Sequence, residues 1–142
     1  MKRRLYAPAK INLCLHVLGR RPDGYHDLAT LMQRIDLRDR LEIEIGPGRE
    51  VSVECPGLDL AGAEENLAAR AARLLLEHLG LERAVSIVID KRIPAAAGLG
   101  GGSSDAAAVL QALNDMLEAR LSRSELMALG VRLGADVPFF IF

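Results

Sequence analysis

The residues between positions 94 and 104 have the composition of a phosphate-binding loop. They read Pro94, Ala95, Ala96, Ala97, Gly98, Leu99, Gly100, Gly101, Gly102, Ser103 and Ser104, so that four of the chain's 13 glycines fall within five positions. Glycine lets a backbone approach a ligand without a Cβ clash, and the N-terminus of a helix attracts negative charge. The segment lies between a predicted strand and a predicted helix, and this arrangement indicates a site for phosphate groups.

The glycine-rich segment differs from two well-known phosphate motifs. No lysine follows Gly102, as a Walker A loop requires, and Ser103 stands where the dinucleotide fingerprint has its third glycine or alanine. A flexible linker is the alternative, because glycine and serine also form linkers. The apolar, regular flanks favour the phosphate site, in which Ser103 and Ser104 either cap the following helix or donate hydroxyl groups to a phosphate.

Lys10 and Asn12 are polar candidates near the start of the chain. Residues 9–18 alternate between apolar and polar side chains, which predicts a half-buried strand. One side would carry Ile11, Leu13, Leu15 and Val17, and the other Lys10, Asn12, Cys14 and His16. Lys10 and Asn12 could then both point into a site, and the alternative for Lys10 is an exposed lysine on a strand.

The remaining polar candidates each have an ordinary structural alternative. Tyr25 and His26 follow an Asp-Gly turn and could stack on and hydrogen-bond a base, or simply pack half-buried. Asn66 could cap a helix or contact a nucleotide. Asp136 follows a helix end, where a lone acid is usually a turn-former. Asp105 suits a helix N-terminus, but it would repel a phosphate unless Mg²⁺ intervened.

The elements that must position these residues are short strands and amphipathic helices. Separate strands are predicted at 28–36, 40–45, 51–55 and 84–90, with breaks at Asp39 and at the Gly46-Pro47-Gly48 turn. Helices are predicted at 65–79, ending at Gly80, at 105–117, and after the capping box that begins at Ser122, ending at Gly134. An antiparallel or mixed sheet is expected from these short strands.

Composition narrows the class of protein. The 142 residues fit one domain, half of them are apolar, and the net charge of −1 argues against a nucleic-acid partner. No apolar window approaches a membrane span, and the start of the chain lacks the apolar core of a signal peptide. Cys14 and Cys55 form no metal or disulfide pattern. A cytoplasmic protein without a membrane partner is therefore expected.

The last four residues, Phe139-Phe140-Ile141-Phe142, are unusually apolar for a chain end. We expect the chain to stop inside an element, and a missing C-terminal domain or a partner chain to cover this segment.

Three segments together resemble the GHMP small-molecule kinases in order and spacing. They are residues 7–13 with 19–26, residues 94–104, and residues 133–138. The glycine loop is shared across that superfamily. The segments around Lys10 and Asn12 and around Tyr25 and His26 are similar to the branch that phosphorylates a cytidine-diphosphate-linked methylerythritol.

The resemblance implies an N-terminal, ATP-binding GHMP domain over residues 1–142, with an α+β fold of the ribosomal-protein-S5 domain-2 kind. It also implies phosphoryl transfer from ATP, with Mg²⁺, to the substrate's 2-hydroxyl in non-mevalonate isoprenoid synthesis. Asp136 would accept the hydroxyl proton, while Lys10 would keep Asp136 ionised and steady the developing charge. Residues 94–104 would wrap the ATP phosphates.

The remaining roles implied by the resemblance concern the two ligands. Tyr25 would stack on the cytosine, His26 would hydrogen-bond its edge, and Asn12 would line the substrate pocket. Asn66 and Lys91 would lie near the adenosine. Because the second half of the family's chain is absent here, we expect these 142 residues to be inactive or nearly so alone. The alternatives are a GHMP kinase for homoserine, mevalonate or a sugar, or a non-catalytic nucleotide- or RNA-binding module of this fold.

Overall fold

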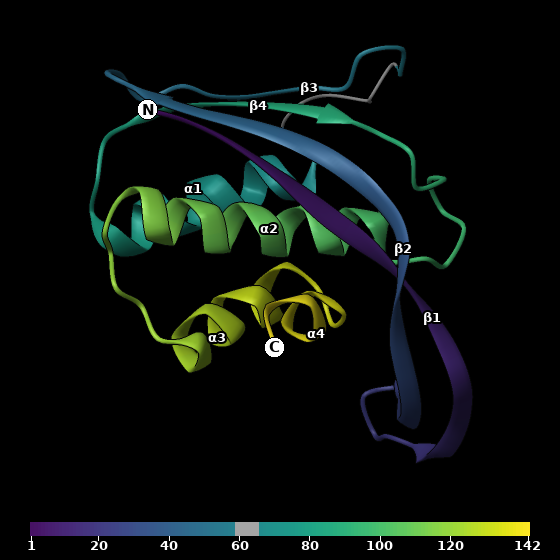
Figure 1. Cartoon of the computed structure of the whole chain (residues 1–142). Coiled ribbons are helices and arrows are strands. Elements are labelled where there is room, and N and C mark those ends of the chain that lie inside the picture. Colours follow the sequence, from purple (N-terminus) through teal and green to yellow (C-terminus); the bar gives the residue numbers. More distant parts are fainter. Residues whose placement is uncertain (59–65) are drawn as a thin grey trace.

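The computed structural model describes residues 1–58 and 66–142 of the chain, and Figure 1 shows its elements. Within these residues, four strands form one sheet in the order β1-β2-β4-β3. The strands are β1 (Lys2–Arg20), β2 (His26–Gly46), β3 (Val51–Glu54) and β4 (Ala84–Asp90). The helices are α1 (Leu67–Leu79), α2 (Gly101–Met116), α3 (Arg123–Leu133) and α4 (Val137–Ile141).

The sheet is mixed. β2 pairs antiparallel with both β1 and β4, whereas β3 pairs parallel with β4. Helices α1 and α2 lie along one face of the sheet, and α3 and α4 pack against α2 on its other side (Figure 1). The predicted α+β class with a mixed sheet is confirmed, and α2 is the element that contacts every other layer.

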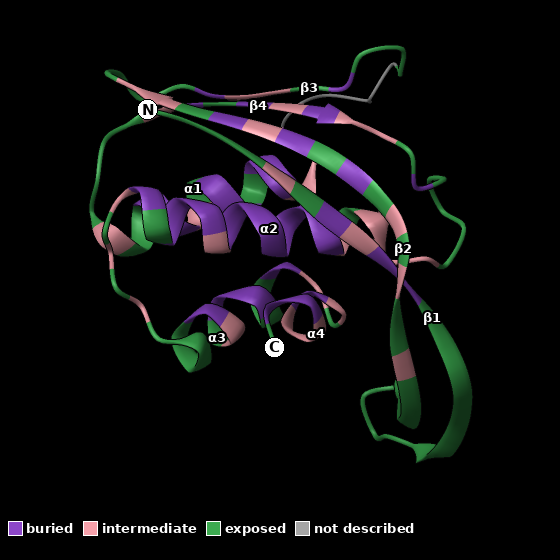
Figure 2. Ribbon diagram, viewed as in Figure 1, coloured by how far each residue is buried: buried purple, intermediate pink, exposed green. Residues whose placement is uncertain are grey.

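The hydrophobic core lies between the sheet and the first two helices. Leu41, Ile43, Ile87 and Ile89 point from the two central strands, where strand alternation turns every second side chain inward. Eleven of the 16 residues of α2 are buried, and most of the helix is purple in Figure 2. Its run of alanines lets the helix approach its neighbours closely on all sides, as the apolar pattern of the sequence predicts.

Most predicted helix ends are confirmed. Asn66 caps α1 by accepting a hydrogen bond from the Ala68 N–H at 2.8 Å, and Gly80 ends that helix at φ +63°. Ser122 and Glu125 form the predicted capping box of α3. The predicted first residue of the earlier helix, Glu65, lies outside the described residues.

The start of α2 differs from the prediction. The helix begins at Gly101 instead of Asp105, so Ser103 and Ser104 lie inside its first turn and cap nothing. Gly100 precedes it in the left-handed conformation at φ +71°, and its carbonyl accepts the Ser104 N–H at 2.9 Å. Of the two alternatives for these serines, the helix cap is therefore wrong, because a glycine that can adopt positive φ turns the chain into the helix four residues earlier.

The predicted break at Asp39 is also wrong. β2 runs without interruption through this residue, and Asp39 is fully buried. Its carboxylate accepts the backbone N–H groups of Arg92 at 2.6 Å and Ile93 at 2.8 Å. Aspartate is unfavourable in strands mainly when its side chain lacks partners, and here the chain after β4 supplies them.

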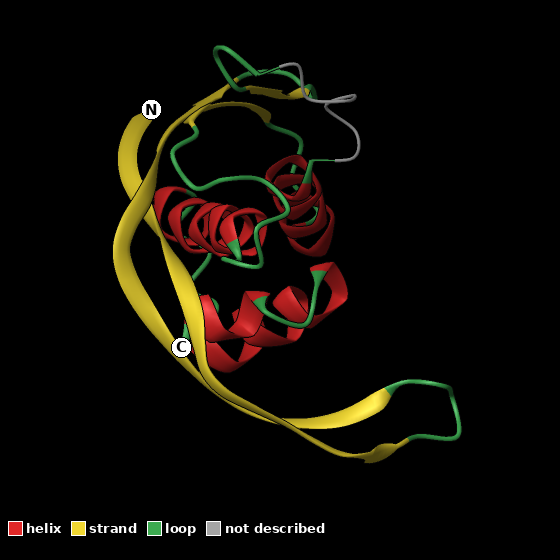
Figure 3. Cartoon of the chain, turned by 90° about the vertical axis from the view of Figure 1, so that its right-hand side faces the viewer, coloured by secondary structure: helices red, strands yellow, loops and turns green. Residues whose placement is uncertain are grey.

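Beyond Lys10, β1 and β2 continue as a two-stranded ribbon that projects away from the helices (Figure 3). Leu13 is 57% exposed and Val17 is 61% exposed, so the predicted half-buried strand is wrong over this part of β1. The alternation of side chains is present, but within the described residues no second layer covers the ribbon. The predicted turn before Tyr25 and His26 is confirmed at the end of the ribbon.

The apolar C-terminal segment forms α4. Phe140 and Ile141 are buried against α2 and α3, whereas Phe142 is largely exposed. Among the described residues, none of the helices combines the length and the apolar character needed to cross a membrane.

Candidate active site

A cavity of about 460 Å³ opens over the N-terminus of α2. Residues 94–103 form much of its wall, and β1 and the start of α4 contribute one residue each, Lys10 and Asp136. Ser104, the last residue of the predicted loop, lies beneath the cavity and is buried. The cavity therefore gathers most of the polar candidates; its remaining lining residues are Asn66, Leu67, Lys91 and Asp105.

The backbone of the glycine loop leaves no room for side chains at its tightest point. Gly100 has φ +71°, and a Cβ there would lie 3.0 Å from Phe140 Cζ and 3.1 Å from Lys10 Cγ. A Cβ on Gly101 would lie 2.9 Å from Ile93 Cγ2. The first N–H groups of a helix have no partner within it, and residues 101–103 line the cavity. This backbone is suited to bind an anion such as a phosphate.

Lys10 and Asp136 come together beside the loop. The Lys10 Nζ atom lies 3.5 Å from the Asp136 Oδ2 atom, and the side chains are 6% and 40% exposed, respectively. The Lys10 N–H also donates to the Leu99 carbonyl at 2.9 Å, which ties β1 to the glycine loop. Asp136 precedes α4 without capping it within the described structure, so its carboxylate is available to the cavity. The alternative of an exposed strand lysine is wrong.

Lys91 is held below the loop by two carboxylates. Its Nζ atom lies 2.5 Å from Asp39 Oδ2 and 2.9 Å from Asp105 Oδ2. Burial and the nearby carboxylate of Asp39 raise the pKa of Asp105 to about 7, although Lys91 lowers it in part. Burial opposes the charge of Lys91, but the two carboxylates outweigh it and raise the pKa of the ammonium. Lys91 is therefore a half-buried cation that borders the cavity from below.

The three substrate candidates lie outside the cavity lining. Asn12 accepts a hydrogen bond from Lys10 Nζ at 3.2 Å, which places it beside the cation. Tyr25 is 73% exposed and lies with His26 at the far end of the ribbon. Only Asn12 is thus close to the Lys10–Asp136 pair in this chain.

Sequence reasoning missed Asp39 as a contributor to the site. Asp39 has the same parity as Leu41 and Ile43, the buried residues of β2, so its side chain had to face the core. An acid in phase with core residues is the signal that could have identified it. Asp105 was noted only as a helix-start residue, and its pairing with Lys91 depends on the tertiary structure.

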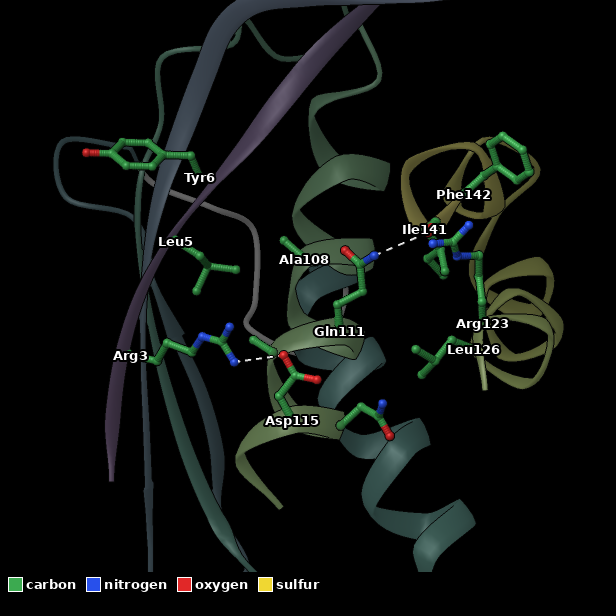
Figure 4. Close-up of a pocket in the computed structure, with 12 residues that line it drawn as sticks. Arg3, Leu5, Tyr6, Ala108, Gln111, Asp115, Arg123, Leu126, Ile141 and Phe142 are labelled. Carbon is green, nitrogen blue, oxygen red and sulfur yellow. Dashed lines mark hydrogen bonds and ion pairs between the residues drawn. The ribbon is translucent and has the colours of Figure 1, made fainter. Parts of the chain in front are cut away.

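A second cavity, of about 500 Å³, is bordered by β1, α2, α3 and α4 (Figure 4). Arg3 donates to Asp115 at 3.0 Å, and the Gln111 side chain donates to the Ile141 carbonyl at 3.3 Å. These polar groups are paired with one another, and none of the candidate residues lines this cavity. This second cavity is therefore not part of the predicted phosphate-binding site.

The similarity of the chain to known proteins identifies its family. The profile of the GHMP kinases N terminal domain matches residues 66–142, which is more than half of the chain. The chain belongs to the GHMP kinases.

Among its relatives, the 4-diphosphocytidyl-2-C-methyl-D-erythritol kinase of Syntrophotalea carbinolica is 60% identical over 136 residues, covering 96% of this chain and 49% of the relative. A crystal structure of 4-(cytidine 5'-diphospho)-2C-methyl-D-erythritol kinase is 48% identical, with a TM-score of 0.80 over 99% of this chain and 48% of that protein. The homoserine kinase of Cytophaga hutchinsonii shares the fold, with a TM-score of 0.70 and 19% identity over 93% of this chain and 40% of that one. The chain thus spans about half the length of the relatives it matches.

Proposed function

We propose that this chain is the ATP-binding part of a kinase that phosphorylates the 2-hydroxyl of 4-diphosphocytidyl-2-C-methyl-D-erythritol. The observation that carries the proposal is the 3.5 Å contact between Lys10 and Asp136 at the edge of the glycine-loop cavity. The 60% identity to a kinase named for that substrate supports the choice of acceptor. Homoserine, mevalonate and sugar kinases are disfavoured, because the homoserine, mevalonate and galactose kinases that share the fold are only 16% to 21% identical.

The geometry is suited to phosphoryl transfer, which depends mainly on alignment and charge neutralisation. Residues 94–104 would surround the phosphates of ATP, and the N–H groups at the start of α2 would bind them. Asp136 would accept the proton of the attacking hydroxyl, or orient that hydroxyl. Lys10 would hold the carboxylate in place and offset the negative charge that develops during transfer.

Two of the predicted nucleotide contacts receive support from the cavity. Asn66 and Lys91 both line it, so both are within reach of a bound nucleotide. The Asn66 side chain also caps α1, and these two roles are compatible because its oxygen accepts from Ala68 while its amide nitrogen is a separate donor.

Magnesium fits the proposed site as a companion of the nucleotide. Within residues 1–58 and 66–142, no three acidic, histidine or cysteine side chains are grouped to hold a metal by themselves. Mg²⁺ commonly takes one or two carboxylates together with phosphate oxygens and water. Asp136, which lines the cavity and reaches solvent, is the residue that would contact it. The ion would supply neutralisation of phosphate charge.

For the acceptor substrate, we propose that Asn12, Tyr25 and His26 form one wall of the binding site. The exposed aromatic ring of Tyr25 is available to stack on cytosine, and His26 follows it directly in the chain. The second half that the longer relatives possess would bring the opposite wall and cover the ribbon. ATP is the phosphate donor, and the cytoplasm, where ATP is abundant, is the compartment we propose.

The test is a measurement of ADP release by the intact protein with 4-diphosphocytidyl-2-C-methyl-D-erythritol, homoserine, mevalonate and galactose as acceptors. We expect kcat/KM for the cytidine substrate to exceed that for each other acceptor by at least about 1,000-fold, because a site built to hydrogen-bond one substrate strongly rejects others. Comparable turnover of homoserine or mevalonate would contradict the substrate assignment. Salt-sensitive binding of RNA without any turnover would favour the non-catalytic alternative.

A further inference from the structure

Two buried carboxylates and a half-buried lysine meet beneath the glycine loop. Asp39 comes from β2, Lys91 follows β4, and Asp105 lies in the second turn of α2. The ammonium of Lys91 contacts both carboxylates, at 2.5 and 2.9 Å. A Cβ added to Gly101 would lie 3.2 Å from the Lys91 Nζ atom. The cation therefore lies directly under the first residue of α2, where a phosphate would bind.

The two carboxylates of this cluster are not equivalent. Asp39 is fully satisfied, since its Oδ2 atom accepts Lys91 and its Oδ1 atom accepts the N–H groups of Arg92 and Ile93. Asp105 accepts only Lys91, through Oδ2, and its buried Oδ1 atom has no hydrogen-bond partner among the described residues. Asp105 also lines the cavity, whereas Asp39 does not.

The cluster has one negative charge in excess. Lys91 supplies one positive charge against two carboxylates, and these three side chains are at most 13% exposed, so water screens them little. The other charged residues that line the cavity, Lys10 and Asp136, pair with each other and leave the excess uncompensated. Three donors stabilise the negative charge of Asp39, whereas only Lys91 stabilises that of Asp105. The uncompensated negative charge of the cluster is therefore that of Asp105. Burial is the main reason that the pKa of Asp105 is raised, and the negative charge of Asp39 adds to it.

We propose that Asp105 is a positioning residue that restrains nucleotide affinity: its carboxylate holds the Lys91 ammonium beneath Gly101 and repels the polyphosphate that binds above it. This inference rests on the proposed function, because it requires a nucleotide in the cavity. Asp105 and the phosphates compete for one cation, and the affinity for a nucleotide depends on that competition. The effect grows with the charge of the ligand and is absent for an uncharged nucleoside.

The test compares the intact protein with its Asp105→Asn variant at pH 8, where the carboxylate is charged. Dissociation constants are measured for adenosine, AMP, ADP and ATP, without acceptor substrate. Asparagine keeps an oxygen for Lys91 but removes the charge. We expect ATP to bind about ten-fold more tightly to the variant, ADP and AMP to gain progressively less, and adenosine to change less than about two-fold.

Asp115→Asn is the matched control, because Asp115 lies on the same helix, pairs with Arg3 and does not line the loop cavity. It should leave all four affinities unchanged. The melting temperature of each variant is also measured at pH 8, to show that it folds. Asp105→Asn should not melt at a lower temperature than the wild type, because it removes an uncompensated negative charge.

Three results overturn the proposal. If the variant binds ATP no more tightly than the wild type, Asp105 and the phosphates do not compete for Lys91. The proposed function would not be affected by this result. A uniform change for all four ligands, or loss of folding, assigns Asp105 a purely structural role. Failure of the wild-type protein to bind ATP would contradict the proposed function as well as this inference.

Discussion

Lys10, on the first strand, and Asp136, at the start of the last helix, bring their charged groups to within 3.5 Å of each other. β1 is fixed to the glycine loop by the hydrogen bond from the Lys10 N–H to Leu99. α4 is fixed to the ribbon by Arg34, which donates to the Phe139 carbonyl at 2.8 Å. The pair therefore depends on two separate tertiary contacts that meet at the cavity.

The first prediction concerns this pair. In the intact protein, Asp136→Asn and Lys10→Met should each lower kcat by about 100- to 10,000-fold, which is the range for loss of a positioned proton acceptor or its charge partner. The dissociation constant for ATP, measured without Mg²⁺, should change only a few-fold, because the loop backbone supplies the phosphate contacts. Steady-state turnover and equilibrium titration measure the two quantities. Unchanged turnover of either variant would remove that residue from the mechanism.

The second prediction concerns the tip of the glycine loop. Gly100→Ala should destabilise the protein by about 2–4 kcal/mol, for two reasons. An alanine is strained in the left-handed conformation of this position, and its Cβ would lie too close to Phe140 and Lys10. Gly98→Ala is the control: its φ is +74°, but nothing lies within 4 Å of its Cβ. Gly98→Ala should cost only about 1 kcal/mol. Equal midpoints for the two variants in urea unfolding would show that the close contacts relax freely.

The third prediction concerns the anchor beneath the loop. Asp39→Asn should destabilise the protein by about 1.5–3 kcal/mol, because a neutral amide replaces the charged acceptor that Lys91 and the Arg92 and Ile93 N–H groups share. Asp36→Asn, on the same strand but largely exposed and paired with Arg38, should have little effect. Denaturant unfolding of both variants measures the difference. A loss for Asp39→Asn no larger than that for Asp36→Asn would mean that the cluster adds nothing to stability.

The fourth prediction concerns pH. The pKa of Asp105 is about 7 in the folded chain, against 3.8 for an unperturbed aspartate. Between these values the folded state retains a proton that the unfolded state releases, so stability falls as pH rises from about 4 to 7 and the loss is complete above 7. The shift corresponds to about 4 kcal/mol at most.

Asp105→Asn should remove this contribution, so its free energy of unfolding should depend less on pH over that interval than that of the wild type. Urea unfolding at pH 4.5, 6 and 8 is the measurement. Parallel curves for the two proteins would show that Asp105 ionises normally in the folded state.

The fifth prediction concerns the end of the ribbon. Tyr25→Ala should raise KM for the cytidine substrate by about 5- to 150-fold, the range expected for losing one base–aromatic stacking contact. The KM for ATP should not change, because Tyr25 does not line the loop cavity. Stability should change little, since the side chain is largely exposed. An unchanged KM for the cytidine substrate would exclude Tyr25 from the acceptor site.

Some features of the fold depended on short stretches of sequence alone. The capping box at Ser122, the left-handed Gly80 after α1, the β4 strand and the glycine loop were all predicted from neighbouring residues. The hydrogen bonds and dihedral angles of the capping box and of the Gly80 cap involve residues only a few positions apart, so the local pattern was sufficient for them. For β4, the alternation of β-branched side chains within the strand was sufficient, although its partner strands are distant in sequence.

The tertiary structure alone decided which side chains are buried. The ribbon kept the predicted alternation, but no layer covers it among the described residues, and its apolar face is exposed. Asp39, read as a break, is buried because the backbone of residues 92 and 93 reaches it from β4.

The residue types alone indicated phosphate chemistry. The glycines of residues 94–104 leave the backbone accessible, and Lys10 and Asp136 lie in two other segments that resemble the family. Only the packing of β1, α2 and α4 around one cavity decided that Lys10 meets Asp136 and that Lys91 is shared by Asp39 and Asp105. The physical reason is that an ion pair between distant residues depends on where whole elements dock. No local periodicity encodes that docking.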